Sequence, residues 1–212
     1  MITVLIDYGA GNLHSAEKAF QRMAREADAG EVILSDRAED VARADRIVLP
    51  GDGAFPACVS ALKGETGVFE ALVEAVERKA RPFLGICVGM QLMARSGHEY
   101  ETIDGLNWID GEVRRITPSD PTLKIPHMGW NDLVIDRPHP VLSGIVSGDH
   151  AYFVHSFQMQ MDGPHQRLAH CDYGGSVTAI VGRDTMVGTQ FHPEKSQATG
   201  LRLIRNWLEW RP

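Results

Sequence analysis

Short apolar runs alternate with longer segments of helical periodicity along the first 86 residues, and this alternation limits the fold more than any other feature of the sequence. We predict strands over residues 2–6, 32–34, 46–49 and 81–86. Between them we predict helices over residues 15–27, 37–43 and 68–79. Strands that alternate with helices pair in parallel through right-handed crossovers. The first half therefore predicts an α/β fold with an open, mostly parallel central sheet flanked by helices.

The second half changes from this alternation to short strands separated by turns. Gly and Pro punctuate it, as in hairpins and meanders. We predict strands over residues 112–116, 132–135, 151–154, 157–161, 167–170, 177–181 and 187–191, and a closing helix over residues 198–210. These strands add an antiparallel β portion to the parallel sheet. Because the sequence contains no linker, low-complexity stretch or internal repeat, we expect one domain over residues 1–212.

Composition excludes several kinds of partner. The chain has 212 residues and a net charge of −7, and its Lys and Arg residues form no basic block, so no nucleic-acid groove is expected. No apolar run approaches the ~20 residues of a membrane span, and residues 1–7 lack the basic start of a signal peptide. Three cysteines, an odd count, indicate free thiols in a reducing cytoplasm. Cys58 and Cys171 have no reactive setting, so we expect buried or semi-buried structural residues.

Cys87 stands at a strand-to-helix transition that is typical of a nucleophile elbow. The apolar run 82–86 leads directly to its thiol, and Gly85 and Gly89 flank it where a sharp turn needs small residues. The positive end of the following helix is expected to favour the thiolate. The N–H of Val88 would face an oxyanion formed on a carbon bound to Cys87. The alternative is a small buried cysteine at a strand end.

His192 and Glu194 stand far downstream and supply an imidazole and a carboxylate. Pro193 between them restricts the backbone, so the two side chains are held in a defined relation. A nucleophile, a base and a carboxylate that orients the base are the three parts of a covalent hydrolase. His192 follows a predicted strand, as Cys87 does. The alternatives are an ordinary surface or core histidine and, for Glu194, a charge at a helix N-terminus.

A glycine-rich loop, Pro-Gly-Asp-Gly-Ala-Phe at residues 50–55, leaves the strand predicted over residues 46–49. Its glycines free backbone N–H groups to point at an anion. The loop emerges beyond the carboxyl end of a strand, where α/β sheets place their functional loops. Taken alone, this pattern is more typical of an ordinary turn between a strand and a helix.

Six segments together carry a resemblance to a known family. They are DYGAGNL at residues 7–13, PGDGAF at 50–55, GICVGMQ at 85–91, PHMGWN at 126–131, YFVHS at 152–156 and QFHPEKS at 190–196. Over nearly its whole length the chain resembles the class I, triad-type glutamine amidotransferases, whose open central sheet is flavodoxin-like. Segment 126–131, Met90 within the elbow and the loop of Asn12 are most similar to the glutaminase subunits of imidazole glycerol phosphate synthases.

This resemblance implies a glutamine-hydrolysing site and assigns its residues. The implied catalytic residues are Cys87, His192 and Glu194, which release ammonia through a cysteine thioester. The implied oxyanion donors are the backbone N–H groups of Asp52 and Val88. The implied substrate contacts are Gly51, Gln91, Glu99, Ser156 and Phe157. Many relatives carry an apolar residue where this chain has Asp52, so we expect its carboxylate to point to solvent or to a partner, away from the oxyanion.

The resemblance also implies a partner, a separate (β/α)8-barrel cyclase subunit that uses the ammonia to make imidazole glycerol phosphate and aminoimidazole carboxamide ribotide in histidine biosynthesis. The implied docking residues are Asn12, Trp130, Tyr152 and Lys195. The alternative is core packing for the two aromatic residues and a solvated charge for Lys195. Neither a cofactor nor a metal is implied. Three other functions stay open: an amidotransferase subunit for another acceptor, a free-standing cysteine hydrolase of the same fold, and a non-enzymatic binding module.

Overall fold

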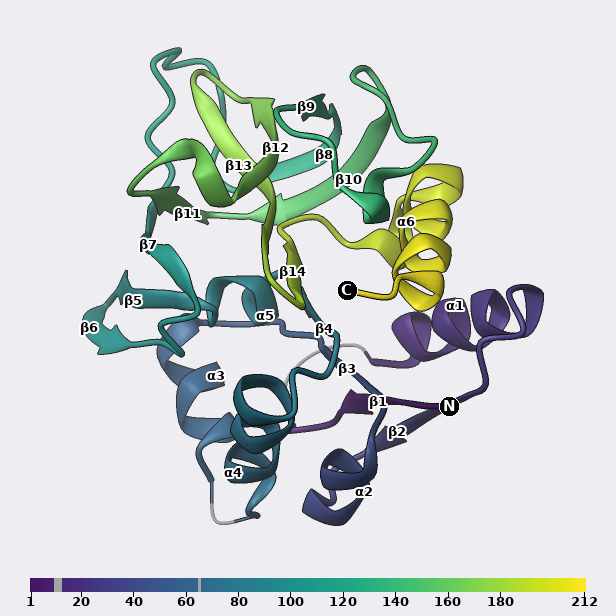
Figure 1. The fold of residues 1–212 in the computed structure, drawn as a ribbon. Helices are drawn as coiled ribbons and strands as arrows, with labels where there is room; N and C mark the ends of the chain where they lie inside the picture. Colours follow the sequence, from purple (N-terminus) through teal and green to yellow (C-terminus); the bar gives the residue numbers. More distant parts are fainter. Residues whose placement is uncertain (10–12, 65) are drawn as a thin grey trace.

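The computed structural model describes residues 1–9, 13–64 and 66–212, and eight of the described strands form its main sheet (Figure 1). Five of these strands are parallel neighbours in the order β2-β1-β3-β4-β14. Their bounds are Glu31–Ser35, Ile2–Ile6, Arg46–Leu49, Phe83–Ile86 and Met186–Thr189, in that order. The sheet continues through three antiparallel strands, β13 (Ser176–Arg183), β12 (Arg167–Asp172) and β9 (Val134–Ile135). The predicted α/β sheet with an antiparallel portion in the second half is therefore confirmed.

Helices flank the parallel part of the sheet. Their bounds are Leu13–Glu26 (α1), Ala38–Arg43 (α2), Phe55–Leu62 (α3), Val68–Val73 (α4), Val88–Gln91 (α5) and Gln197–Glu209 (α6), and α4 continues into a π-helical turn over Glu74–Arg78 (η1). Helix α1 packs against the C-terminal α6, and α2 packs against α4 (Figure 1). The α1–α6 contact includes an edge-to-face pair of Phe20 and Trp207 with ring centroids 6.0 Å apart. Within the described residues, no helix combines the length and apolar character needed to cross a bilayer.

Two smaller sheets complete the β portion. One has the strand order β11-β7-β5-β6, with bounds Phe157–Met161, Ile109–Arg115, Ala94–Glu99 and Glu101–Asp104. The other pairs β8 (His127–Asp132) with β10 (His150–His155) in antiparallel register. Short 3-10 turns lie at Pro140–Leu142 (η2), Pro164–Gln166 (η3) and Pro193–Lys195 (η4). Each turn begins with a proline, whose restricted φ suits the first position of a helical turn.

Several elements differ from the sequence prediction, and strands β5, β6 and β8 are absent from it. The helix expected after Cys87 has only four residues, because the chain from Ala94 pairs with β7 and becomes strand β5. Helix α3 is absent from the prediction, although Pro56 near its start is a signal of a helix N-terminus. The single strand expected over residues 132–135 is wrong, because β8 ends at Asp132 and the chain turns at the buried Leu133 before β9.

The register of the parallel strands brings three segments to one edge of the sheet. Gly85 pairs with Leu49 on β3 and with Gly188 on β14, and Ile86 pairs with Thr189. The residues that follow β3, β4 and β14 therefore leave the sheet side by side at its carboxyl edge, where α/β sheets form ligand sites. These residues belong to the loop 50–55, the turn at Cys87 and the segment 190–196.

Candidate active site

Cys87 occupies a strained backbone position at the carboxyl end of β4. Its φ of +55° and ψ of −112° lie in a region that residues other than glycine rarely adopt, and such strain concentrates at functional sites. The Cys87 N–H donates to the Thr189 carbonyl at 2.8 Å, and the Cys87 carbonyl accepts from the Met90 and Gln91 N–H groups at 3.1 Å. A strained turn between a buried strand and a helix is the geometry of a nucleophile elbow.

Close packing around this turn requires two glycines. A Cβ atom on Gly85 would lie 2.6 Å from the Gly89 carbonyl oxygen, and a Cβ atom on Gly89 would lie 1.8 Å from the Leu49 carbonyl oxygen. Both neighbours are backbone atoms, so no larger residue fits unless the backbone moves. The two small residues that flank Cys87 therefore let α5 approach β3 and β4.

His192 and Glu194 lie next to Cys87, just beyond the end of β14. The His192 Nδ1 atom is 2.8 Å from Glu194 Oε1, and a carboxylate only accepts, so Nδ1–H donates. The Nε2 atom is then the ring nitrogen left for the thiol. Burial by itself lowers the pKa of His192, but hydrogen bonds and charge interactions with Cys87 and Glu194 outweigh it and raise the pKa to about 10. The imidazole is therefore arranged to take a proton from the thiol and to hold it.

The loop after β3 packs against the start of α5. A Cβ atom on Gly51 would lie 2.7 Å from the Gly89 nitrogen and 2.9 Å from Val88 Cβ, so only glycine allows this approach. Neither the Val88 N–H nor the Asp52 N–H donates a hydrogen bond to any residue that the structure describes. Asp52 is exposed, and its carbonyl accepts a weak hydrogen bond from Cys58 Sγ at 3.5 Å. Backbone N–H groups beside a thiol have the chemistry of an oxyanion site.

A cavity of about 230 Å³ opens beside Cys87 and gathers most of the predicted substrate contacts. Its lining consists of Asp52, Gly53, Cys87, Val88, Gln91, Glu99, Pro126, Val154, His155, Ser156 and Phe157. Gly51 is not part of this lining. It borders a much smaller pocket on the side of the imidazole, together with His192, Glu194 and Lys195.

Gln190 is a buried residue of the site that sequence reasoning left without a role. Its Nε2 atom lies 3.8 Å from Cys87 Sγ, and its Oε1 atom accepts from Gln91 Nε2 at 3.0 Å. Gln91 Nε2 also donates to the Phe157 carbonyl at 3.0 Å. The amide nitrogen of Gln91 is thus engaged with protein groups, so its oxygen is the atom left for a ligand. In the sequence, the position of Gln190 two residues before the predicted base His192 was the indication that it belongs to the site.

Glu99 is anchored at the wall of the same cavity. Its Oε2 atom accepts from the Phe55 N–H at 2.8 Å, and Phe55 is the first residue of α3. A carboxylate held in this way presents negative charge to the cavity. His155 also lines the cavity, and sequence reasoning did not assign it a role.

Three of the four predicted docking residues lie near this site, and Asn12 lies outside the described residues. Trp130 on β8 is 47% exposed, so the alternative of core packing is wrong for it. Its ring packs edge to face against the half-buried Tyr152 on β10, with centroids 5.7 Å apart. Lys195 is exposed beside the imidazole. Met128, 66% exposed on the same strand as Trp130, extends this apolar surface and was not predicted.

The other two cysteines lack the setting of Cys87. All three are free thiols, and Cys58 and Cys171 are buried. Burial raises the pKa of Cys58 to about 11 and that of Cys171 to about 12. A buried thiol with a raised pKa is inert at neutral pH. The predicted burial of both residues is confirmed.

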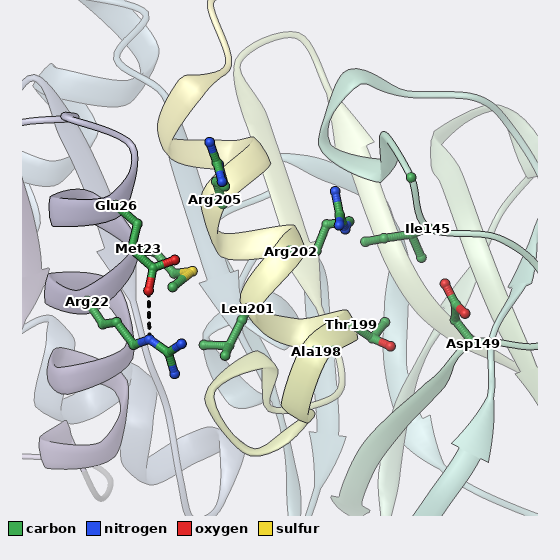
Figure 2. Close-up of a pocket in the computed structure, with 11 residues that line it drawn as sticks. Arg22, Met23, Glu26, Ile145, Asp149, Ala198, Thr199, Leu201, Arg202 and Arg205 are labelled. Carbon is green, nitrogen blue, oxygen red and sulfur yellow. Dashed lines mark hydrogen bonds and ion pairs between the residues drawn. The ribbon is translucent and has the colours of Figure 1, made fainter.

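A larger cavity lies away from the thiol, between α1, α6 and the loop after η2 (Figure 2). Its volume is about 380 Å³, and its polar lining includes Arg22, Arg202, Arg205 and Asp149. Arg22 is paired with Glu26 at 2.9 Å. The lining contains neither cysteine nor histidine, whereas Cys87 borders the cavity of about 230 Å³ and His192 borders the small pocket beside it. Across residues 1–9, 13–64 and 66–212, no cluster of His, Cys, Asp and Glu side chains is arranged to hold a metal ion.

Known proteins share this sequence and this fold. The family model of glutamine amidotransferase class-I matches residues 4–209. The chain is 70% identical to a protein of Cereibacter sphaeroides named imidazole glycerol phosphate synthase subunit HisH, and the match covers all of both chains. It is 67% identical, again over all of both chains, to the protein of that name from Ruegeria pomeroyi. A crystal structure of a glutamine amidotransferase has the same fold, with a TM-score of 0.72 at 19% identity over 97% of each chain. This chain therefore belongs to the class-I glutamine amidotransferase family.

Proposed function

We propose that this chain hydrolyses glutamine to glutamate and ammonia and passes the ammonia to a separate synthase subunit. The observation that carries the proposal is the position of Cys87, at a strained strand end, beside His192, whose Nδ1 atom is bound to Glu194. The relatives from Cereibacter sphaeroides and Ruegeria pomeroyi, which match along their whole length, support imidazole glycerol phosphate synthase as the enzyme served.

The first step is attack of the Cys87 sulfur on the side-chain amide carbon of glutamine. His192 takes the thiol proton at Nε2, and Glu194 at 2.8 Å stabilises the imidazolium that forms. The amide oxygen becomes an oxyanion in the tetrahedral intermediate. The N–H groups of Val88 and Asp52 stabilise it, each by about 3 kcal/mol.

Collapse of this intermediate breaks the carbon–nitrogen bond. His192 gives its proton to the leaving nitrogen, so ammonia departs and a γ-glutamyl thioester remains on Cys87. A water molecule that transfers a proton to His192 then attacks the thioester carbon. The thiolate leaves, the imidazolium returns the proton to it, and glutamate is released.

The wall of the cavity orients the substrate for this attack. The Glu99 carboxylate and the Gln91 amide oxygen suit the α-ammonium group of glutamine, since both are acceptors. The strand backbone at Ser156 and Phe157 borders the same space and suits the α-carboxylate. Gly51 contributes indirectly, because its missing side chain lets the oxyanion loop close on α5.

The ammonia must reach its acceptor without equilibrating with solvent. Free ammonia is mostly protonated at neutral pH, and ammonium is not a nucleophile. We assign as the partner a (β/α)8-barrel cyclase that uses the ammonia to make imidazole glycerol phosphate and aminoimidazole carboxamide ribotide in histidine biosynthesis. It docks on a surface, here called the docking surface, formed by Met128, Trp130, Tyr152 and Lys195; the resemblance adds Asn12, which lies outside the described residues. Exposed aromatic and methionine side chains are enriched at the centre of interfaces.

We further propose that residues 1–212 act as one domain in the cytoplasm. A single hydrophobic cluster includes side chains of both chain halves, from Val4 on β1 to Leu208 on α6. Three free thiols suit a reducing compartment.

The test is glutamate release by the purified chain, with and without the cyclase subunit and its nucleotide ligand. Cys87→Ala is expected to abolish glutamine-dependent turnover and to leave ammonia-dependent synthesis by the complex. Cys171→Ala, which removes a buried thiol outside the cavity, is the matched control. Loss of both activities in Cys87→Ala would contradict the division of labour. A full glutaminase rate without the cyclase would favour a free-standing hydrolase.

A further inference from the structure

Two buried histidines form a continuous chain of hydrogen bonds from Asn131 on β8 to the cavity wall. His155 Nδ1 lies 2.8 Å from the Phe157 carbonyl oxygen. His155 Nε2 lies 3.1 Å from His127 Nδ1. His127 Nε2 lies 3.2 Å from Nδ2 of Asn131, the residue after Trp130. The two histidines are 2% and 6% exposed, so bulk water does not compete for these bonds.

The direction of every bond in this chain is fixed from both ends. The Phe157 carbonyl only accepts, so the proton of His155 is on Nδ1 and its Nε2 is an acceptor. The Asn131 oxygen accepts from the Asp132 N–H at 2.8 Å and its nitrogen donates to the Asp172 carbonyl at 2.9 Å, which orients the amide. Asn131 Nδ2 therefore donates to His127 Nε2, and His127 donates from Nδ1 to His155. Both imidazoles are neutral, each with its proton on Nδ1.

Packing keeps the pair neutral. The His127 ring is stacked between Tyr173, at 4.0 Å between centroids, and Phe153, at 4.8 Å. Burial lowers the pKa of His127 to about 4 and that of His155 to about 3. A second proton on either ring would place two N–H donors opposite each other, so one hydrogen bond of the chain would be lost.

Several titratable groups surround the pair. His192 repels a proton on His155, and Cys87 and Glu99 line the same cavity as His155. On the other side, the Asp172 carboxylate accepts from the Gly175 N–H at 3.1 Å, and the Tyr173 hydroxyl donates to the Lys124 carbonyl at 2.7 Å. No carboxylate of the described residues is hydrogen-bonded to either ring, so neither imidazole gains from a second proton.

The Phe157 carbonyl is the point at which this chain reaches the reacting groups. It accepts from His155 on one side and from Gln91 Nε2 at 3.0 Å on the other. Gln91 in turn donates to Gln190, whose Nε2 faces the Cys87 sulfur. The His155–Phe157 bond also closes over Ser156, the residue at the turn between β10 and β11. One imidazole therefore sets the position of the backbone that borders the cavity.

We propose that His155, held by His127, is a positioning residue that fixes the Ser156–Phe157 backbone for binding the α-carboxylate and α-ammonium end of glutamine. This inference rests on the proposed glutaminase function. It assigns His155 an effect on substrate binding and not on proton transfer, because its only ring proton is committed to Phe157. Loss of the bond therefore weakens ground-state and transition-state binding alike, which raises KM with little change in kcat.

Two replacements at His155 separate the bond from the bulk of the ring. His155→Asn keeps a donor near the position of Nδ1, whereas His155→Gln moves the amide to the position of Nε2 and removes that donor. In the complex with the cyclase, His155→Gln is expected to raise KM for glutamine at least about tenfold with less than about threefold change in kcat. His155→Asn is expected to raise KM less than about threefold. His139→Asn is the control, a partly buried histidine packed on Trp210 outside the cavity.

If His155→Gln does not fold, a second pair of variants at His127 tests the same chain of hydrogen bonds. His127→Leu removes the donor to His155 and is expected to raise KM for glutamine. His127→Asn keeps a donor near the position of Nδ1 and is expected to keep KM near the wild-type value. Nitrogen-15 NMR of the wild type is expected to report both rings as neutral Nδ1–H tautomers at neutral pH. Unchanged KM in His155→Gln and His127→Leu, or a fall in kcat alone, would overturn the inference while the wild type still releases glutamate. Absence of glutamate release by the wild-type complex would instead overturn the proposed function, and the inference with it.

Discussion

The backbone N–H of Cys87 donates to the carbonyl of Thr189 at 2.8 Å, and this bond joins the ends of two neighbouring parallel strands. It lies at the point where β4 ends and the turn that carries Cys87 begins. At the same level β14 ends and the segment that carries His192 begins. The distance between thiol and imidazole is therefore set by strand register and not by either loop alone. A slip of one residue between β4 and β14 would turn Gln190 and His192 to the opposite face of the sheet.

Replacing Glu194 by glutamine is expected to lower the pKa of His192 and to slow glutamine hydrolysis by about two orders of magnitude. The amide keeps the shape of the carboxylate but loses the charge that stabilises the imidazolium. The measurement is kcat/KM for glutamate release as a function of pH, together with the His192 titration followed by NMR. Glu209→Gln is the control, since Glu209 pairs with Arg205 at 3.1 Å on an exposed face of α6. An unchanged rate would show that Glu194 does not support the base.

The buried pair His127 and His155 is expected to make the protein less stable in acid. Their pKa values are lowered by burial to about 4 and about 3, whereas histidines of the unfolded chain take up protons near pH ~6.5. Between these values the unfolded state binds more protons than the folded state. The stabilisation is therefore complete above about pH 6.5 and is lost as the pH falls toward 4. The raised pKa of His192 acts in the opposite direction above about pH 6.5, but it is common to the wild type and the variant compared below and cancels between them.

This prediction is checked by urea unfolding at about pH 7.5 and about pH 5 for the wild type and His127→Asn. Between the two values the wild type is expected to lose about 1–2 kcal/mol more of its free energy of unfolding than the variant. Equal losses would mean that His127 carries a second proton in the folded protein.

Gly89→Ala is expected to destabilise the fold by more than about 2 kcal/mol and to abolish glutaminase activity. The added Cβ atom would lie 1.8 Å from the Leu49 carbonyl oxygen, so α5 must move away from β3 and carry the Val88 N–H with it. Thermal unfolding and glutamate release measure the two effects. Gly163→Ala is the control, because Gly163 likewise has no positive φ and its added Cβ atom would meet only the exposed His165 side chain, at 3.2 Å. Similar losses in both variants would show that the clash with the Leu49 carbonyl is not the cause.

Trp130→Ala is expected to leave the stability of the isolated chain within about 0.5 kcal/mol, because the side chain is exposed. The same change is expected to weaken cyclase binding by about 10- to 100-fold, as for an aromatic anchor at the centre of an interface. Calorimetric titration of the variant with the cyclase subunit is the measurement. Val146→Ala, which changes an apolar residue that is 62% exposed outside the docking surface, is the control. Equal affinity of the two variants would place the interface elsewhere.

Much of the fold was predictable because its signals are local. The apolar runs at β1 and β3 and the helical spacing in α1 and α6 each specify an element without reference to the rest of the chain. Strand β5 and the early end of α5 were not predictable in this way. Residues 92–94 form helix-compatible sequence, but Leu92 and Met93 form a turn and Ala94 begins β5, because Ala94 pairs with Ile109 on β7.

The candidate site was likewise predictable only where its signals are local. The sequence indicated three catalytic residues, Cys87, His192 and Glu194, because their residue types and neighbours are typical of a covalent hydrolase. Gln190, His127 and His155 were quoted within motifs and received no role, since nothing in a motif tells which polar groups will face one another. Their bonds depend on β10, β11 and β14 meeting around Cys87.

The sequence by itself determined the class of fold and the kind of chemistry, because periodicity and residue type are properties of short segments. Only the tertiary structure decided that β14 lies beside β4, that two neutral imidazoles join Asn131 to the Phe157 carbonyl, and that Trp130 stays exposed. These contacts join segments far apart along the chain. Which of them form is settled by the free energy of the whole packed core, to which each local segment contributes only a small part.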